Sequence, residues 1–187
     1  MVKTLSSRLN YPEDLKEPQR LFFSCKKFEL DPSSCNNKGE VFKGEKRMKD
    51  LEVGKERLKK GASLAFVKEG QVLYESQGKG VLPILEAYKY REKLKDSLVV
   101  DTVVGLCHAM ISAKIGVKSI YGKVFSQTAI DFLEEKRIPF SYETLVDVIL
   151  NQTGEDYCPM EKRAMESSNI EELLEKIDEF FREVRRK

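Results

Sequence analysis

Residues 62–142 alternate between short apolar segments of strand length and longer segments with a helical apolar period. Residues 62–76 hold two apolar segments on either side of Glu69-Gly70, which predicts a β-hairpin with a tight turn. After Pro83, which suits the first turn of a helix, we expect helix, helix, strand, helix and strand. Because strands that alternate with helices form sheets covered by helices, the pattern predicts an α/β fold. The expected ranges are 83–95, 102–114, 118–125, 127–136 and 138–142.

Two of the expected helices begin after residues that cap helix N-termini. Asp101 precedes the helix at 102–114, and Ser126 precedes the helix at 127–136. A further short helix is expected at 144–150. In the helix expected at 102–114, small residues recur at every fourth position, so we expect another element to approach it closely. These small residues are Gly105, Ala109 and Ala113.

Two more helix starts are expected near the C-terminus. Pro159 follows Cys158 at the first helical position, and Glu161 stands where a capping glutamate is found. Ser168 and Glu171 then have the spacing of a capping box. The helix that follows carries an apolar face formed by Ile170, Leu173, Leu174, Ile177, Phe181 and Val184.

The first part of the chain differs in composition from the rest. Proline recurs along it, and residues 33–39 have the composition of a loop. We therefore divide the chain into an irregular N-terminal extension, 1–47, and an α/β domain, 48–187. The extension either packs loosely on the domain or precedes a true start at Met48. From Met48 to Lys60 a plausible amphipathic helix opens the domain.

Composition excludes several classes of protein. The chain has 187 residues, 41% of them hydrophobic, and a net charge of +2. It contains no apolar run of about 18–20 residues, so no membrane partner is expected, and it shows no signal-peptide pattern, so the expected location is cytoplasmic. Its charges are balanced, whereas nucleic-acid binders usually carry a basic face, so no nucleic-acid partner is expected.

The cysteines show no pairing that would bind a metal. None forms a CxxC pair, so the default is reduced thiols in a cytosolic protein. The chain also has a single histidine. We therefore predict neither a structural zinc site nor another cofactor. The cysteines are Cys25, Cys35, Cys107 and Cys158.

Four short segments share their order and spacing with one known family. They are Asp101-Thr-Val-Val-Gly105, Val117-Lys-Ser-Ile-Tyr121, Ser141-Tyr142-x-x-Leu145-Val146 and Cys158-Pro159-Met160-Glu161. On these segments the chain resembles the family Domain of Unknown Function 1893 (DUF1893) over most of residues 48–187. The resemblance implies a cytidine-deaminase-like fold, which is a three-layer α/β/α sandwich with a mixed sheet. The N-terminal extension lies outside it.

The resemblance does not extend to the zinc-binding residues of deaminases. Those enzymes hold a zinc-bound water with ligands from H-x-E and P-C-x-x-C, and the Glu moves protons. The corresponding helix starts here are Asp101-Thr102-Val103 and Ser126-Gln127-Thr128, without Cys or His. His108 is expected about two turns into its helix, as a core or helix-surface residue. We therefore predict that the protein binds no zinc and is not a zinc-dependent deaminase.

The leading functional hypothesis is a ligand-binding or regulatory domain. In a deaminase-like arrangement the helix starts at Asp101 and Ser126 face one pocket, where backbone N–H groups bind a nucleotide-derived small molecule. The predicted ligand-binding residues are Asp101, Gly105 and Ser126. Asp101 would repel a phosphate but accept a hydrogen bond from a base amino group or a ribose hydroxyl. The competing interpretation is that both residues are simple helix caps.

Two alternatives remain open. In the first, Cys158 is a catalytic nucleophile supported by Glu161 and Tyr142, because a helix N-terminus lowers the pKa of a thiol. Its own competing interpretation is a capping or packing cysteine. In the second, the protein is a structural partner, and its last helix packs on a neighbour, for example in a homo-oligomer.

Overall fold

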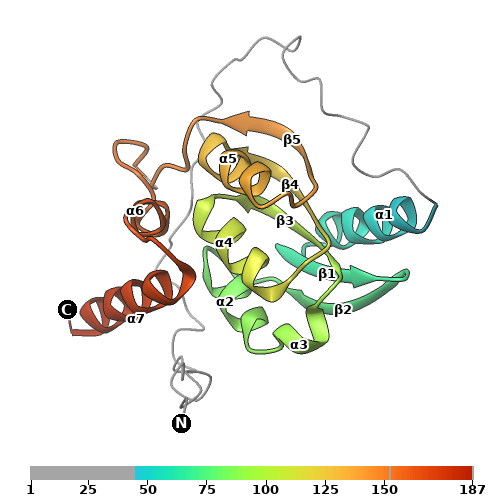
Figure 1. Cartoon of the computed structure of the whole chain (residues 1–187), viewed down its shortest axis with the longest axis horizontal. Coiled ribbons are helices and arrows are strands. Elements are labelled where there is room, and N and C mark those ends of the chain that lie inside the picture. The colour runs from blue at the N-terminus through green and yellow to red at the C-terminus, as the bar shows by residue number, and fades with distance from the viewer. Residues whose placement is uncertain (1–44, 152, 187) are drawn as a thin grey trace.

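The computed structural model describes residues 45–151 and 153–186, and the N-terminal extension predicted at 1–47 lies almost wholly outside them. A five-stranded mixed sheet forms the centre of the fold, in the order β2-β1-β3-β4-β5 (Figure 1). β1 pairs antiparallel with β2 and β3, whereas β3, β4 and β5 run parallel. The strands are β1 Leu64–Lys68, β2 Gln71–Ser76, β3 Leu98–Val104, β4 Ser119–Ser126 and β5 Phe140–Val146.

The predicted hairpin is confirmed as β1 and β2. Its turn residues Glu69 and Gly70 both have positive φ, 53° and 75°, as the tightest hairpin turns require. The carboxylate of Asp50 accepts hydrogen bonds from both of their backbone N–H groups, at 3.3 and 2.5 Å. Asp50 belongs to the first helix, so this contact fixes the hairpin against that helix.

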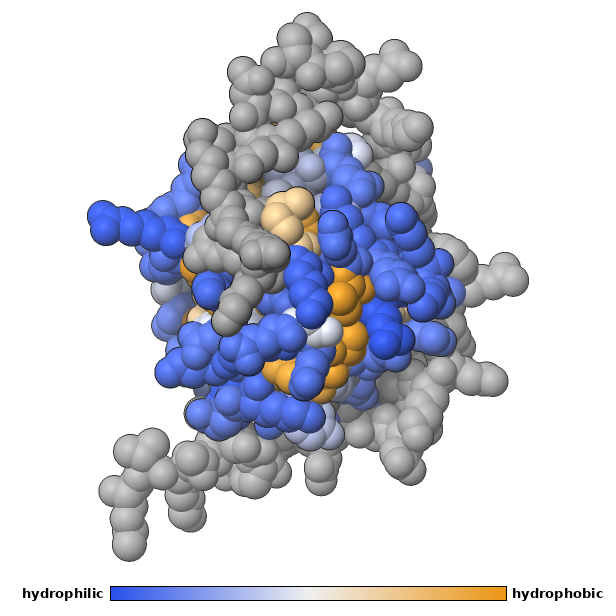
Figure 2. All heavy atoms as spheres, turned by 90° about the vertical axis from the view of Figure 1, so that its right-hand side faces the viewer, coloured by the Kyte–Doolittle hydropathy of each residue, from blue (hydrophilic) through white to orange (hydrophobic). Residues whose placement is uncertain are grey.

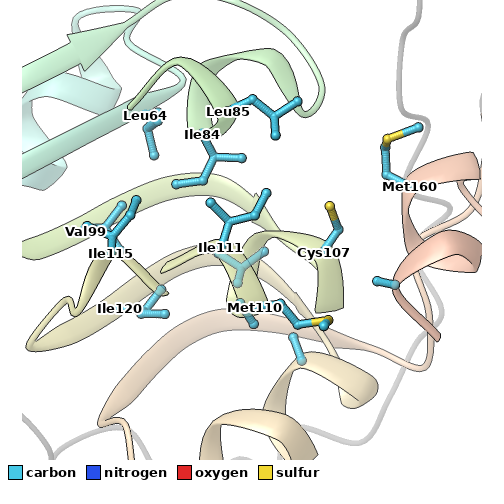
Figure 3. Close-up of a cluster of buried hydrophobic side chains, with 14 of the residues drawn as sticks. Leu64, Ile84, Leu85, Val99, Cys107, Met110, Ile111, Ile115, Ile120 and Met160 are labelled. Atoms are coloured by element: carbon cyan, nitrogen blue, oxygen red, sulfur yellow. The ribbon is translucent and has the colours of Figure 1, made fainter. Parts of the chain in front are cut away.

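Helices pack against both faces of the sheet. Along β1, Leu64 and Phe66 face one apolar cluster and Ala65 faces another, as strand alternation requires. α1 covers the second cluster, and α2, α4 and α5 cover the first, where Ile84 and Ile111 face the sheet (Figure 3). The helices are α1 Glu45–Lys59, α2 Leu82–Tyr88, α3 Arg91–Leu94, α4 Leu106–Ile115, α5 Gln127–Glu135, α6 Pro159–Met165 and α7 Ile170–Arg186.

Figure 2 shows the molecule from the side that bears α1. The surface on this side is mainly hydrophilic, with a narrow band of apolar residues. Among the described residues, no helix combines the length and the apolar character that crossing a membrane requires.

The prediction of a helix from Thr102 capped by Asp101 was wrong. Asp101 lies inside β3, between Leu64 of β1 and Gly122 of β4. The β-branched residues around it favour a strand, and two neighbouring strands supply its backbone with partners. Helix α4 starts only at Leu106, with Gly105 as its N-cap in an extended conformation.

Three other boundaries also differ from prediction. In place of the expected helix at 144–150, residues 144–146 end β5, where Thr144 pairs with Val124 of β4, and Leu150 forms an isolated bridge with Tyr157. The single helix expected at 83–95 is divided into α2 and α3 around Lys89 and Tyr90. The first helix begins at Glu45, before the expected Met48.

The C-terminal segment follows prediction with a shift of one residue. The cap of α7 is Asn169, whose side chain accepts a hydrogen bond from Glu172 N at 2.9 Å. The side chain of Glu172 accepts one from Ser168 N at 2.8 Å. Along α7 the inward side chains are Leu173, Ile177 and Phe181, whereas Val184 is 49% exposed.

Candidate functional site

A cavity of about 260 Å³ lies where the carboxyl end of β3 meets the start of α4. Besides Ser63, three parts of the chain enclose it: the loop Gly78-Lys79-Gly80 with the start of α2, the segment from Asp101 to His108, and the segment from Ile149 to Glu161. The glycine loop is exposed, whereas Asp101, His108 and Glu161 are buried. The cavity therefore joins an exposed loop to buried polar side chains.

Asp101 is held by its own strand and lies against α4. Its Oδ1 accepts hydrogen bonds from Val103 N at 3.0 Å and from the Thr102 hydroxyl at 3.3 Å. Its Oδ2 lies 3.2 Å from Nε2 of His108, and the Asp101 side chain is 12% exposed. A carboxylate fixed in this way can accept a hydrogen bond from a ligand in the cavity.

His108 lies closer to the cavity than the sequence predicted. Because α4 begins at Leu106, His108 is in its first turn and lines the cavity. Its Nδ1 lies 3.3 Å from the hydroxyl of Ser112. Its buried Nε2 is close to Asp101 but is misaligned for a hydrogen bond. Ser112 is fully buried, so this Asp-His-Ser series has no accessible nucleophile.

Glu161 connects the N-termini of α4 and α5. Its Oε2 accepts a hydrogen bond from Leu106 N at 2.8 Å. Its Oε1 accepts from the hydroxyls of Ser126 at 2.9 Å and Thr128 at 2.5 Å. The side chain is only 2% exposed, and burial raises the pKa of this carboxyl, while the Thr128, Ser126 and backbone donors oppose that rise. The positive ends of two helix dipoles stabilise its negative charge.

Gly105 makes the approach of Glu161 possible. A methyl group added at this position would collide with Oε2 of Glu161 and lie 3.1 Å from Ile149. The φ of Gly105 is −98°, which any residue can adopt. The requirement for glycine is therefore one of space and not of backbone conformation.

The structure brings two of the three predicted ligand-binding residues together. Asp101 and Gly105 line the same cavity. Ser126 caps α5 as predicted, accepting from Ala129 N at 3.2 Å, but it is fully buried and bonded to Glu161. It is not among the described residues that line the cavity. The backbone N–H of Leu106, at the observed start of α4, is also bonded to Glu161.

The residues of the nucleophile hypothesis are only partly assembled. Cys158 and Glu161 line the cavity, but Tyr142 stacks against Phe125 and Phe140 and is not among its described lining residues. Burial raises the pKa of Cys158 more than nearby backbone N–H groups lower it, contrary to the predicted fall. A seven-residue helix that begins in the interior does not offset the loss of water.

The donors around the cavity do not suit a zinc ion. Cys107 is buried and its pKa is raised strongly, first by burial and then by Glu161 and Cys158, so its metal-binding thiolate is disfavoured. The start of α5 contributes hydroxyl groups. Over the part of the chain that the structure describes, no three Cys, His, Asp or Glu side chains converge as metal ligands. The absence of bound zinc remains a prediction.

Sequence reasoning missed the roles of His108 and Glu161. The signal for His108 was the valine-rich strand before it, which places the helix start four residues later than a cap at Asp101 would. Glu161 was recognised as a local cap and as a support for Cys158, but not as a link between α4 and α5. Its partners Leu106 and Ser126 lie 55 and 35 residues away, so no local pattern could reveal them.

Comparison with known proteins gives a consistent match over this region. A family model described as a domain of unknown function (DUF1893) matches residues 53–181. The crystal structure of a DUF1893 family protein, TM1506 from Thermotoga maritima, is similar, with 29% sequence identity and a TM-score of 0.65. The alignment covers 74% of this chain and 93% of that chain. No curated protein matches. The matched range includes every segment that encloses the cavity.

Proposed function

We propose that this chain, which belongs to the DUF1893 family, is a ligand-binding domain whose cavity takes a nucleotide-like small molecule. The observation that carries the proposal is the buried Asp101 carboxylate, which lines the cavity while Val103 N and the Thr102 hydroxyl hold it in place. Small-molecule sites are typically apolar cavities with a few oriented polar groups.

The walls of the cavity suit a flat organic group. Ile84, Ile149 and Met160 line it alongside the polar groups. Its volume of about 260 Å³ is close to the lower end of the range for small-molecule sites, roughly 300–1,000 Å³. A base or nucleoside therefore fits the space better than a dinucleotide.

A deaminase-like ancestry is part of the proposal. It is supported by the resemblance and by the sheet, in which an antiparallel hairpin adjoins three parallel strands. Ligands in open α/β sheets bind beyond the carboxyl ends of parallel strands, which is where this cavity lies. The first turn of α4 holds Cys107 and His108 but no glutamate two residues after either of them, and the start of α5 holds neither Cys nor His. Because no three such ligands converge among the described residues, we propose binding or regulation without zinc-dependent hydrolysis.

The test is ligand-induced stabilisation. Nucleosides, nucleotides and dinucleotides are screened by differential scanning fluorimetry, and at least one class is expected to raise the melting temperature. At a concentration of about 100 times Kd the gain is about 2.7 kcal/mol, which for a chain of this size is about 5–10 °C.

A matched pair of variants locates the binding. Val81 borders the cavity, so Val81→Trp fills it and should abolish the shift. Val184 is exposed on α7, so Val184→Trp is the control and should keep the shift. Unchanged melting of the wild-type protein across the whole panel contradicts the proposal.

The nucleophile alternative receives no support from the site. Cys158 is 4% exposed, burial raises the pKa of its thiol, and the only histidine of the chain is directed at Asp101. A thiol that is mostly protonated is a poor nucleophile.

A further inference from the structure

The carboxylate of Glu161 already occupies the position where the N-termini of α4 and α5 converge. Converging N–H groups at helix starts are a common site for phosphate. Here Glu161 takes the N–H of Leu106 and the hydroxyls of Ser126 and Thr128. A ligand phosphate would therefore have to displace a buried carboxylate from several hydrogen bonds.

The buried part of the cavity carries a second carboxylate. Asp101 already accepts from Val103 N, and its other oxygen lies beside His108. The lining lysine, Lys79, is on the exposed glycine loop. The charges of Asp101 and Glu161 thus repel an anion from the buried end, whereas a hydrogen-bond donor would be accepted there.

From this arrangement we infer that Glu161 is a specificity-determining residue, which makes the ligand enter with an uncharged, hydrogen-bond-donating group innermost. This inference rests on the proposed function. The donor contacts Asp101 and is either an amino group of a base or a hydroxyl of a ribose. Any phosphate of the ligand stays towards the exposed loop 78–80.

Binding measurements on the wild-type protein test the orientation. Isothermal titration calorimetry at pH 8 compares adenosine and cytidine with their 5′-monophosphates and with inorganic phosphate. We expect nucleoside and monophosphate affinities within about threefold of each other, and no competition by inorganic phosphate. A monophosphate that binds more than about tenfold tighter than its nucleoside, or competition by phosphate, overturns the inference while leaving the proposed function intact.

The source of the donor is resolved with matched ligands. Inosine and uridine replace the amino group of adenosine and cytidine by an oxo group, and 2′,3′-dideoxy nucleosides lack the 2′- and 3′-hydroxyls of the ribose. One of these two changes should weaken binding by about tenfold, the loss of one hydrogen bond to a charged group. That loss should be smaller in Asp101→Asn, whose uncharged amide oxygen accepts a weaker hydrogen bond, and should persist in full in the control Asp147→Asn, an exposed aspartate outside the lining. Equal binding of all the matched ligands contradicts the assigned contact.

The role of Glu161 has a separate readout that does not need the ligand. Glu161→Ala removes the internal carboxylate and leaves its donors available to a small anion. Sodium formate, compared with sodium chloride at equal ionic strength, should then raise the melting temperature by about 3 °C or more. The wild-type protein and the control Glu134→Ala, which removes an exposed glutamate of α5, should show no such effect.

Each outcome of the formate experiment decides the point. If Glu161→Ala does not fold in chloride, recovery of folded protein in formate supports the inference. Equal behaviour in formate and chloride overturns it. If no nucleoside or nucleotide binds the wild-type protein, the proposed function and the ligand orientation fail together, and the formate response still shows whether Glu161 occupies an anion position.

Discussion

Substitution of Gly105 by alanine tests the contact between α4 and α6 directly. The added methyl group would overlap with Oε2 of Glu161 and lie 3.1 Å from Ile149. The backbone conformation itself tolerates alanine, because φ is −98°. The cost therefore arises from displacing the carboxylate from Leu106 N, where the hydrogen bond is 2.8 Å long.

The magnitude follows from two contributions. Overpacking of a buried position costs about 1–3 kcal/mol, and weakening a hydrogen bond to a charged group costs about 1.5–3 kcal/mol. A shift of α6 would relieve the overpacking but weaken the hydrogen bond, so the two costs do not add in full. We therefore expect Gly105→Ala to lower the free energy of unfolding by about 2–4 kcal/mol. Gly78, an exposed glycine with its nearest neighbour atom at 3.1 Å, is the control, and Gly78→Ala should cost less than about 1 kcal/mol.

The assay is urea unfolding followed by far-ultraviolet circular dichroism, since the chain has no tryptophan. A double-mutant cycle isolates the contact: in Glu161→Ala the obstacle is absent, so the further change Gly105→Ala should cost at least about 1 kcal/mol less than in the wild-type protein. If the two single effects add to within about 0.5 kcal/mol, Gly105 and Glu161 are not coupled and the argument from space is refuted.

Three further predictions concern protonation, reactivity and metal. The pKa of Glu161 is raised in the folded state, so the folded chain binds this proton more tightly than the unfolded chain. The contribution of Glu161 to the free energy of unfolding is therefore largest below pH 4.5 and falls as the pH rises through the raised pKa. The stability lost in Glu161→Gln, measured by urea unfolding, should therefore be larger at low pH than at pH 8, and a pH-independent loss contradicts this. Because its pKa is raised and it is buried, Cys158 should react with iodoacetamide at pH 7.5 at least about tenfold more slowly than a free thiol, as read by peptide mass spectrometry; a faster reaction revives the nucleophile hypothesis. Elemental analysis after dialysis should find no stoichiometric zinc, and one zinc per chain that is lost in His108→Ala or Cys158→Ser would revive deamination.

The parts of the fold that could be predicted are those determined by neighbouring residues. Glu69-Gly70 predicted the hairpin because few residue pairs adopt positive φ at both turn positions. Ser126 predicted the start of α5, and Pro159 the start of α6, because their effects are confined to the first turn.

The parts that failed depend on tertiary partners. Asp101 has the side chain of a helix cap, but its backbone lies between β1 and β4, so strand pairing overrode the local signal. The helix starts at Asp101 and Ser126 were predicted to face one pocket, but Asp101 lines the cavity with Gly105 and not with Ser126. Glu161 separates Ser126 from this cavity. The sequence could not predict this, because it depends on the docking of α6, which lies far from Ser126 along the chain.

The connection made by Glu161 also bears on the order in which the chain assembles. The sheet and the helices α4 and α5 are complete by residue 146, yet the N–H of Leu106 and the buried hydroxyl of Ser126 receive their acceptor only from residue 161. During synthesis the earlier elements emerge with these donors bonded to water. Docking of α6 expels that water and covers the cavity from its third side. About the last fifth of the chain therefore completes the interior, and the cavity is enclosed only after α6 has docked.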